Sequence, residues 1–218
     1  MTAFRFDKVV LPPEVEIVRE EVRDFIADNR VLMQPMPMGF SPEFSRAMAE
    51  RGWIAMTWPK QYGGRGGSPT MKAIYDEEMA KANAPHSVNP LGLAFLGPTV
   101  MAIGTDAQKR DIIKPLLHTE VIWCQGFSEP GAGSDLAALQ MKAEAQGEQY
   151  LLNGQKIWTS YANKADWCFC LVRTDTSKKH EGISFVLIDM RTPGVEARPI
   201  RLINGASPFC ETFFTDVR

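Results

Sequence analysis

The hydrophobic pattern of the chain changes near residue 120. Before that point apolar residues recur at helical spacing and no strand signal is present. From Val121 onward, short runs alternate apolar and polar residues, with glycine- and proline-containing turns between them. Side chains repeat every 3.6 residues in a helix and every two in a strand, so the two parts must fold differently. We expect an α+β chain, with an all-α helical domain over residues 1–120 and a small β-barrel or β-sandwich domain over residues 121–218.

Capping and proline signals divide the first part into helices. Ser41 before Pro42 is a typical helix start, and Gly52 suits the end of the same helix. The predicted helices cover residues 12–29, 42–51, 68–82, 90–103 and 107–117, the fourth interrupted at its glycines. Two connections are predicted to be irregular: the Pro- and Met-rich residues 32–39, and residues 53–67, whose four glycines indicate a surface connector.

The second part is predicted to consist of short strands joined by turns. The predicted strands cover residues 139–145, 149–152, 155–160, 167–173, 182–188, 195–200 and 209–215. Gln146-Gly147 is expected to join the first two, and Asn153-Gly154 to form a hairpin turn between the second and third. Cys168 and Cys170 lie two residues apart on one strand face, and we expect all four cysteines to be buried and reduced.

Charge and hydropathy exclude several classes of function. With 24 basic and 26 acidic residues, the balance does not favour nucleic acid or an anionic membrane as a partner. No apolar run approaches the roughly 20 residues that span a bilayer. The first 16 residues contain no apolar leader and do not resemble a transit peptide, which predicts an intact start and a cytoplasmic protein. The scattered His86, His118 and His180 form no metal-binding motif.

The loop at residues 125–135, QGFSEPGAGSD, is the strongest candidate for a binding site. Its glycines let the backbone approach a ligand closely, Pro130 fixes a bend, and exposed N–H groups of such a loop can hold an anion. The third glycine of a dinucleotide-binding G-x-G-x-x-G is missing, and no βαβ unit surrounds the loop. The alternative is a tight turn without a ligand.

A second candidate is the stretch at residues 153–160, NGQKIWTS. It places a large aromatic ring, Trp158, next to the hydroxyl groups of Thr159 and Ser160. Together with the polar loop, this combination suits a flat heteroaromatic cofactor with a phosphate tail. The alternative is that Trp158 belongs to the core, as most strand tryptophans do.

These stretches resemble the acyl-CoA dehydrogenase family. The loop, the NGQK and WTS segments and residues 192–195 (TPGV) occur in the family's order, and the resemblance covers essentially the whole chain. It implies an FAD-dependent enzyme that dehydrogenates a fatty acyl-CoA thioester, with hydride transfer to flavin N5. It also implies a homo- or hetero-oligomer, usually a tetramer, that passes electrons to electron-transfer flavoprotein.

The resemblance assigns roles to nine residues. The expected cofactor-binding residues are Gln125, Gly126, Phe127, Ser128, Gly133, Ser134, Trp158, Thr159 and Ser160. The first four match the part of the loop that contacts the isoalloxazine and ribityl chain, although Gln125 departs from an aromatic residue found in some members. Gly133 and Ser134 match the part that meets the pyrophosphate, and Ser134 also matches a contact to the CoA thioester.

The resemblance likewise implies how the second stretch acts. Trp158 matches a tryptophan that packs against the flavin, on the side away from the substrate. Ser160 matches a hydroxyl that bonds N5, where a donor stabilises the reduced ring. Thr159 is expected to contact the cofactor mainly through its backbone.

No catalytic base is assigned in this sequence. Glu129, Asp135 and Glu211 are carboxylates near the candidate site, but the resemblance implies that Glu129 is structural and caps loop N–H groups. In the family the base lies in a C-terminal helical domain, and this chain stops before it. We therefore expect the chain alone to hold FAD weakly and to turn over little.

Three alternatives remain open. An acyl-CoA oxidase would keep the same fold and pass electrons to oxygen, and a non-catalytic companion subunit would lend structure to an active partner. The run Lys178-Lys179-His180 is expected to be a solvated hairpin tip, and the alternative is contact with a phosphate of CoA.

Overall fold

The computed structural model describes residues 10–34 and 39–218. By contacts the chain divides into two compact units, Met1–Ser87 and Val88–Arg218, which are described separately. Residues 1–9 of the predicted N-terminal start and residues 35–38 of the predicted link lie outside the described residues. Within the described residues, no helix is long and apolar enough to cross a membrane.

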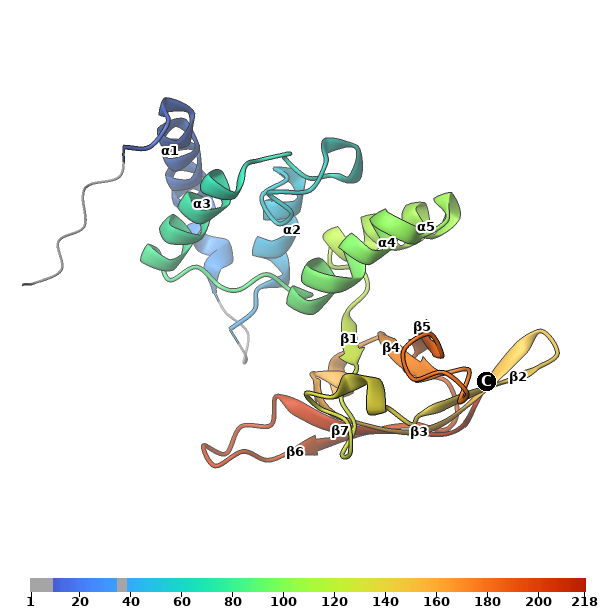
Figure 1. Cartoon of the computed structure of the whole chain (residues 1–218). Helices are drawn as coiled ribbons and strands as arrows, with labels where there is room; N and C mark the ends of the chain where they lie inside the picture. The colour runs from blue at the N-terminus through green and yellow to red at the C-terminus, as the bar shows by residue number, and fades with distance from the viewer. Residues whose placement is uncertain (1–9, 35–38) are drawn as a thin grey trace, which may run out of the picture. The chain divides into compact units, whose positions relative to one another are not determined.

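The first unit is helical (Figure 1). Its elements are α1 (Pro13–Asp28), the 3-10 turn η1 (Arg30–Met33), α2 (Pro42–Glu50), the 3-10 turn η2 (Lys60–Tyr62) and α3 (Pro69–Lys81). Ser41 and Ser68 cap α2 and α3, because each side chain accepts a hydrogen bond from a backbone N–H three residues on. The three predicted helices of this unit are confirmed.

The glycine-rich segment 53–67 is not the surface connector that the sequence predicts. Trp53 and Met56 are fully buried, and the Trp53 ring stacks on Tyr75 at 5.7 Å. The guanidinium of Arg65 lies 3.9 Å from the centre of the Trp53 ring. A Cβ on Gly64 would come within 2.1 Å of the Trp58 carbonyl oxygen, so close packing explains that glycine. A prediction from the glycines alone misses the burial of this segment, because it ignores the apolar residues between them.

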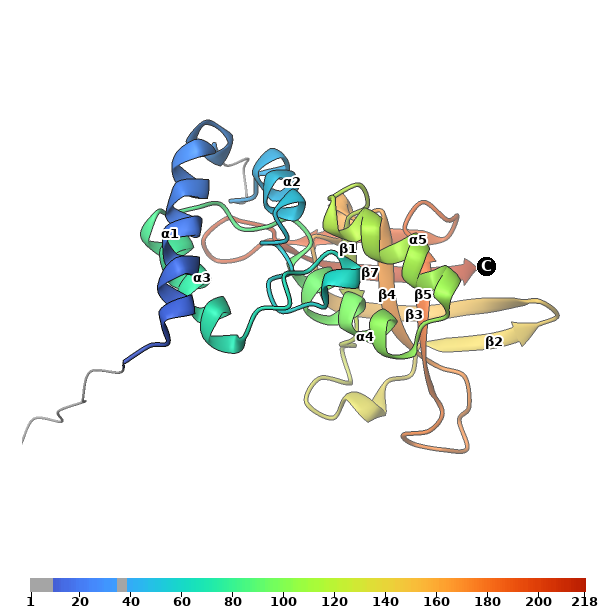
Figure 2. The same ribbon diagram turned by 90° about the horizontal axis from the view of Figure 1, so that it is seen from above.

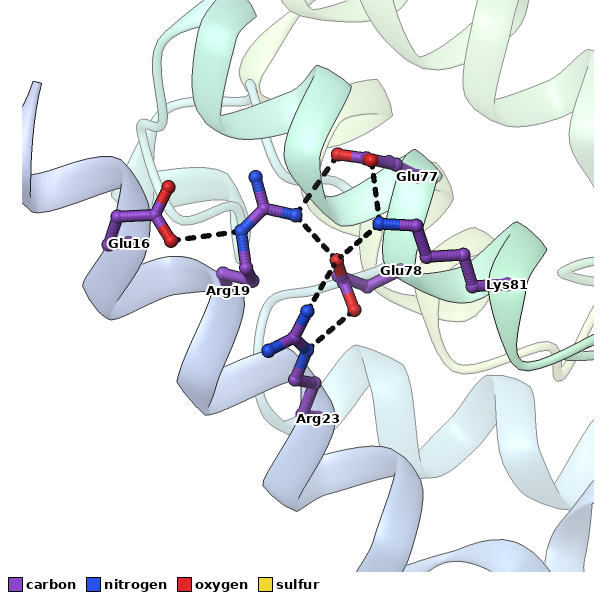
Figure 3. A network of polar contacts seen from close by, with 6 residues as sticks. All are labelled: Glu16, Arg19, Arg23, Glu77, Glu78 and Lys81. Carbon is purple, nitrogen blue, oxygen red and sulfur yellow. Dashed lines mark hydrogen bonds and ion pairs between the residues drawn. The ribbon is translucent and has the colours of Figure 1, made fainter. Parts of the chain in front are cut away.

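A network of charged side chains joins α1 to α3 (Figure 3). Glu78 of α3 is 4% exposed and accepts hydrogen bonds from Arg19 and Arg23 of α1. Arg23, Arg19 and Lys81 together lower the pKa of Glu78 to about 2. Because a buried carboxylate without such partners would be very costly, this network fixes how the two helices pack.

The second unit begins with two helices. The predicted interrupted helix is continuous: a π-helical turn, η3 (Gly92–Leu96), runs directly into α4 (Gly97–Ile103). A Thr105 capping box then starts α5 (Asp106–Leu117). The side chain of Asn89 bonds to the Val121 carbonyl and accepts from the Trp123 N–H, and so ties this helical segment to the first strand. The unit boundary by contacts, between Ser87 and Val88, thus lies before the change from helix to strand.

Seven strands follow and form one sheet. They are β1 (Trp123–Gly126), β2 (Lys142–Gln146), β3 (Gln149–Ser160), β4 (Trp167–Arg173), β5 (Ile183–Asp189), β6 (Val195–Ile200) and β7 (Phe209–Val217). The strand order is β1-β4-β2-β3-β7-β6, with β5 paired to β4. Figure 2 shows α4 and α5 with the strands of this unit. Helices followed by a curled β half-barrel confirm the predicted α+β class.

The predicted hairpin at Asn153-Gly154 is wrong. Residues on both sides belong to one strand, β3, whose hairpin partner β2 is joined to it at Gly147. Gly154 pairs with Phe214 of β7, and a Cβ on Gly154 would lie 2.7 Å from Met141 Cγ. The Asn153 side chain bonds to Asp216 across the strand pair. This Asn-Gly pair thus serves close packing between strands and does not reverse the chain.

Buried sulfur atoms make up much of the core of the sheet. All four cysteines are buried and free, as predicted. They pack in one cluster with Met141, Leu152, Phe214 and Val217. Burial raises the pKa of the Cys170 thiol, so this thiol stays protonated.

Candidate functional site

The candidate loop starts at the end of β1, where packing requires its first glycine. A Cβ on Gly126 would lie 2.9 Å from the Sγ atoms of both Cys168 and Cys170. Gly126 therefore lets β1 lie against the cysteine face of β4. Phe127 follows and meets Phe169 edge-on at 5.8 Å, while Gln125 is half-buried within β1.

The middle of the loop is a tight turn whose tip is exposed. Glu129 and Ala132 exchange backbone hydrogen bonds of 2.9 and 3.0 Å across Pro130-Gly131. No atom lies within 4 Å of a Cβ built on Gly131 or Gly133, and neither glycine has a positive φ. The chain's own packing and backbone geometry thus do not require these glycines, and the space above them is open to a ligand.

A buried ion pair holds the loop against β3. Lys156, with a fully buried side chain, places Nζ 2.8 Å from Glu129 Oε1 and donates to the Phe127 carbonyl at 3.1 Å. The Glu129 carboxylate also accepts from the backbone N–H groups of Gln140 and Met141, at 2.7 and 2.9 Å. Glu129 is therefore structural, as expected, but the N–H groups that it caps belong to residues 140 and 141, which follow the loop. The role of Lys156 was not predicted, although its place in alternation with Leu152 marks it as inward-facing.

The loop and the Trp158 strand lie side by side. The Ile157 N–H donates to the Ser128 carbonyl at 2.9 Å, directly before Trp158. The two stretches selected from the sequence therefore meet in the structure.

Trp158 sits at an irregularity that turns it out of the core. The register between β3 and β7 shifts between Lys156 and Thr159, and Trp158 has φ +60°. Lys156 and Thr159 are both buried, so the bulge replaces normal alternation and leaves the indole 53% exposed. A left-handed backbone is strained for so bulky a residue, and such strain concentrates at functional sites. The alternative of a core tryptophan is thereby excluded.

The two hydroxyl residues after Trp158 have different surroundings. Thr159 is 1% exposed, and its Oγ1 has no hydrogen-bond partner among the described residues. Ser160 is half-buried and pairs with Phe209, whose ring meets the Trp158 indole edge-on at 6.0 Å. Ser160 and Trp158 thus occupy one end of β3, close to the exposed indole.

The hollow beside the loop lies next to the Pro130-Gly131 turn. Its volume is about 370 Å³, and it is lined by loop residues together with Gln140, Met141, Gly154 and Gln155. Trp158 is not among the lining residues.

The remaining candidate carboxylates and basic residues have protein partners. Asp135 pairs at the surface with Lys179, at 3.1 Å, and Glu211 accepts from Gln155. Lys178 pairs with Glu181, and the tip at residues 178–180 is exposed, as predicted.

An exposed indole in a strained conformation, an adjacent turn with open glycines and a buried unpartnered hydroxyl are features of a binding site. Comparison with family models identifies the family: the acyl-CoA dehydrogenase N-terminal domain matches residues 12–120, and the middle domain matches residues 124–217. The chain belongs to the acyl-CoA dehydrogenase family.

Three relatives illustrate its place in that family. The acyl-CoA dehydrogenase IpdE1 of Mycobacterium tuberculosis (strain ATCC 25618 / H37Rv) is 42% identical over 94% of this chain and 57% of its own length. The solved ChsE4-ChsE5 complex of Mycobacterium tuberculosis matches with a TM-score of 0.82 and 36% identity, over 97% of this chain and 55% of the matched chain. A structure described as the Tcur3481-Tcur3483 steroid ACAD matches with a TM-score of 0.81 and 31% identity, over 96% and 56%. The chain thus spans a little over half the length of these relatives.

Proposed function

We propose that this chain forms the FAD-contacting part of an acyl-CoA dehydrogenase, which removes hydrogen from the α and β carbons of an acyl-CoA thioester. The observation that supports this most strongly is Trp158, exposed at a strained φ of +60° beside the Ser128 turn. Family membership is the reason for proposing FAD as the cofactor, since acyl-CoA dehydrogenases use FAD.

In this proposal the chain's residues bind and orient the cofactor and the substrate, and bound FAD supplies the hydride acceptor. Trp158 would pack its indole against the isoalloxazine, and Ser160 would supply a hydroxyl to N5. Ser128 bonds the pyrimidine end, with Gln125, Gly126 and Phe127 beside it. Thr159 contributes mainly backbone contacts.

The open part of the turn takes the anionic tail and the substrate. The N–H groups at Gly133 and Ser134 would hold the pyrophosphate, because successive exposed amides of such a loop can bind an anion. Ser134 also contacts the acyl-CoA thioester. We assign no catalytic base to this chain.

The relatives favour a bulky substrate and a second subunit. Both matched structures are described by a pair of protein names, and one of the two is described as a steroid ACAD. We therefore propose a steroid-type acyl-CoA as the first substrate to test, ahead of a straight-chain fatty acyl-CoA. We also propose a hetero-oligomeric assembly that passes electrons to electron-transfer flavoprotein.

The binding test compares two exposed aromatic residues of the same strand. FAD is titrated against the wild-type chain, Trp158→Ala and the control Tyr150→Ala, whose side chain is 49% exposed on β3. We expect the Kd to rise about tenfold or more for Trp158→Ala, since ring stacking and burial together contribute about 1.4 kcal/mol or more. Tyr150→Ala should bind as the wild type does. Equal affinity of the two variants would overturn the proposed site.

The activity test separates the dehydrogenase from its two alternatives. The chain, co-purified with its partner, receives steroid-type and straight-chain acyl-CoA with an artificial electron acceptor. Reduction of the acceptor supports a dehydrogenase, and peroxide formation in its place supports an oxidase. A chain that binds no flavin while its partner does would support a companion subunit.

A further inference from the structure

A second buried cation lies behind the candidate loop, and no motif identified it. Arg173, the last residue of β4, is 9% exposed. Its guanidinium donates to the carbonyls of Ala137 at 2.7 Å and Leu139 at 3.2 Å on one side. On the other side it donates to the carbonyls of Lys178 at 2.9 Å and Lys179 at 2.7 Å.

These four carbonyls belong to two segments far apart in the sequence. Residues 137–139 follow directly after the Gly133-Ser134-Asp135 part of the loop, and residues 178–179 form the exposed tip between β4 and β5. The surface ion pair between Lys179 and Asp135 joins the same two segments. The planar guanidinium, with five donors in a fixed fork, therefore sets where the C-terminal side of the loop lies.

The two buried cations near the loop differ in charge balance. Lys156, on the N-terminal side, is neutralised by Glu129. Arg173 donates only to carbonyl oxygens and, within the described parts of the chain, forms no direct ion pair. The exposed Asp175 carboxylate, two residues further on, is bonded to Ser177 and is near enough for Arg173 to help lower its pKa. Burying a cation without a direct ion-pair partner is costly, even when it is fully hydrogen-bonded. A ligand anion above the turn would offset that cost.

We propose that Arg173 is the positioning residue for the anionic part of the ligand: it fixes the Gly133-Ser134 turn and supplies the positive potential that retains a diphosphate there. This inference rests on the proposed function, because it takes the diphosphate of FAD as the anion. Arg173 acts through the backbone it holds and through its field, without touching the ligand.

The test separates the diphosphate from the flavin ring. Kd values for FAD and for riboflavin, which has the ring but no diphosphate, are measured by flavin fluorescence for the wild type, Arg173→Met and Arg173→Lys. Arg191→Met is the matched control, because Arg191 is an exposed arginine that pairs with Asp189 in the same unit. We expect Arg173→Met to weaken FAD binding about tenfold and riboflavin binding less than twofold, given one unit charge at an effective dielectric constant near 20. Arg173→Lys keeps the charge and should recover part of the FAD affinity.

Amide hydrogen exchange without ligand supplies a second readout. In Arg173→Met, exchange should quicken at residues 133–139 and 178–180 and stay unchanged in the β3–β7 pair. A loss of FAD and riboflavin affinity by the same factor, or faster exchange throughout the unit, would mean a merely structural role and would overturn the inference. If wild type binds FAD and Arg173→Met leaves its affinity unchanged, the inference alone fails. If wild type binds neither flavin, the proposed function fails and the inference with it.

Discussion

Each compact unit contains a buried charged cluster, but the two clusters do different things. In the first unit, Glu78 is surrounded by Arg19, Arg23 and Lys81, and every member belongs to one of two packed helices. In the second unit, Lys156 and Glu129 hold a loop whose tip has no packing partner of its own. The first cluster fixes one helix on another, whereas the second keeps an exposed turn in one conformation. Buried charge thus stabilises a scaffold in one place and pre-organises a site in the other.

The largest effect is expected from breaking the loop cluster. Lys156→Met would leave the Glu129 carboxylate buried without its cation, and such losses cost about 3–5 kcal/mol. Urea unfolding should show this loss, while Lys142→Met, at an exposed position on β2, should unfold as wild type does. If both variants unfold alike, the pair does not hold the loop.

The next effect is expected at Gly126, the first glycine of the loop. Gly126→Ala would push a methyl group to 2.9 Å from two buried sulfur atoms, and overpacking of this kind costs about 1–3 kcal/mol. Thermal unfolding of the purified variant measures the cost. A Tm equal to that of wild type would mean that β1 can move away from the cysteines at no cost.

The helix cluster should be weaker and should depend on pH. The pKa of Glu78 is lowered to about 2 in the folded state, so its contribution is present above its unfolded pKa and is lost as pH falls from about 4.5 towards 2. Glu78→Gln should therefore destabilise the chain by about 1–2 kcal/mol at pH 7, and the difference from wild type should shrink towards pH 3. Urea unfolding of both proteins at several pH values tests this. A difference that is constant with pH would contradict the role of the carboxylate charge.

The smallest effect on stability is expected at the exposed tip. Gly131→Ala meets no atom within 4 Å, so unfolding should change by less than about 0.5 kcal/mol. In our proposal a ligand approaches this turn, and the added methyl group should weaken FAD binding several-fold. Calorimetry and flavin titration of the same sample measure the two effects. Lower stability with unchanged FAD affinity would show that this glycine serves folding.

The sequence predicted the elements well where the signals were local. Ser41 caps its helix as expected, and the apolar run at residues 167–173 is β4. The Asn153-Gly154 hairpin failed because a turn signal cannot reveal that Asn153 pairs with Lys142 of β2 while Gly154 pairs with Phe214 of β7, a strand about 60 residues later. The pairing of distant strands, unlike a cap, depends on the whole fold.

The sequence predicted the residues that form the candidate site, but not the buried charged residues that hold them in place. The loop and Trp158 were selected from composition and resemblance, and the Ser128–Ile157 hydrogen bond brings them together. Lys156 and Arg173 were missed because charged residues on strands usually face solvent. The strained φ of Trp158 has no sequence signal, since bulges arise from strand pairing.

The most direct test of the central claim is amide hydrogen exchange of the wild-type chain with and without FAD. Our account predicts that FAD slows exchange at residues 126–135 and 157–160 together, with little change in α1 and α3. Protection confined to other segments, or none at saturating FAD, would contradict a flavin held between the loop and Trp158.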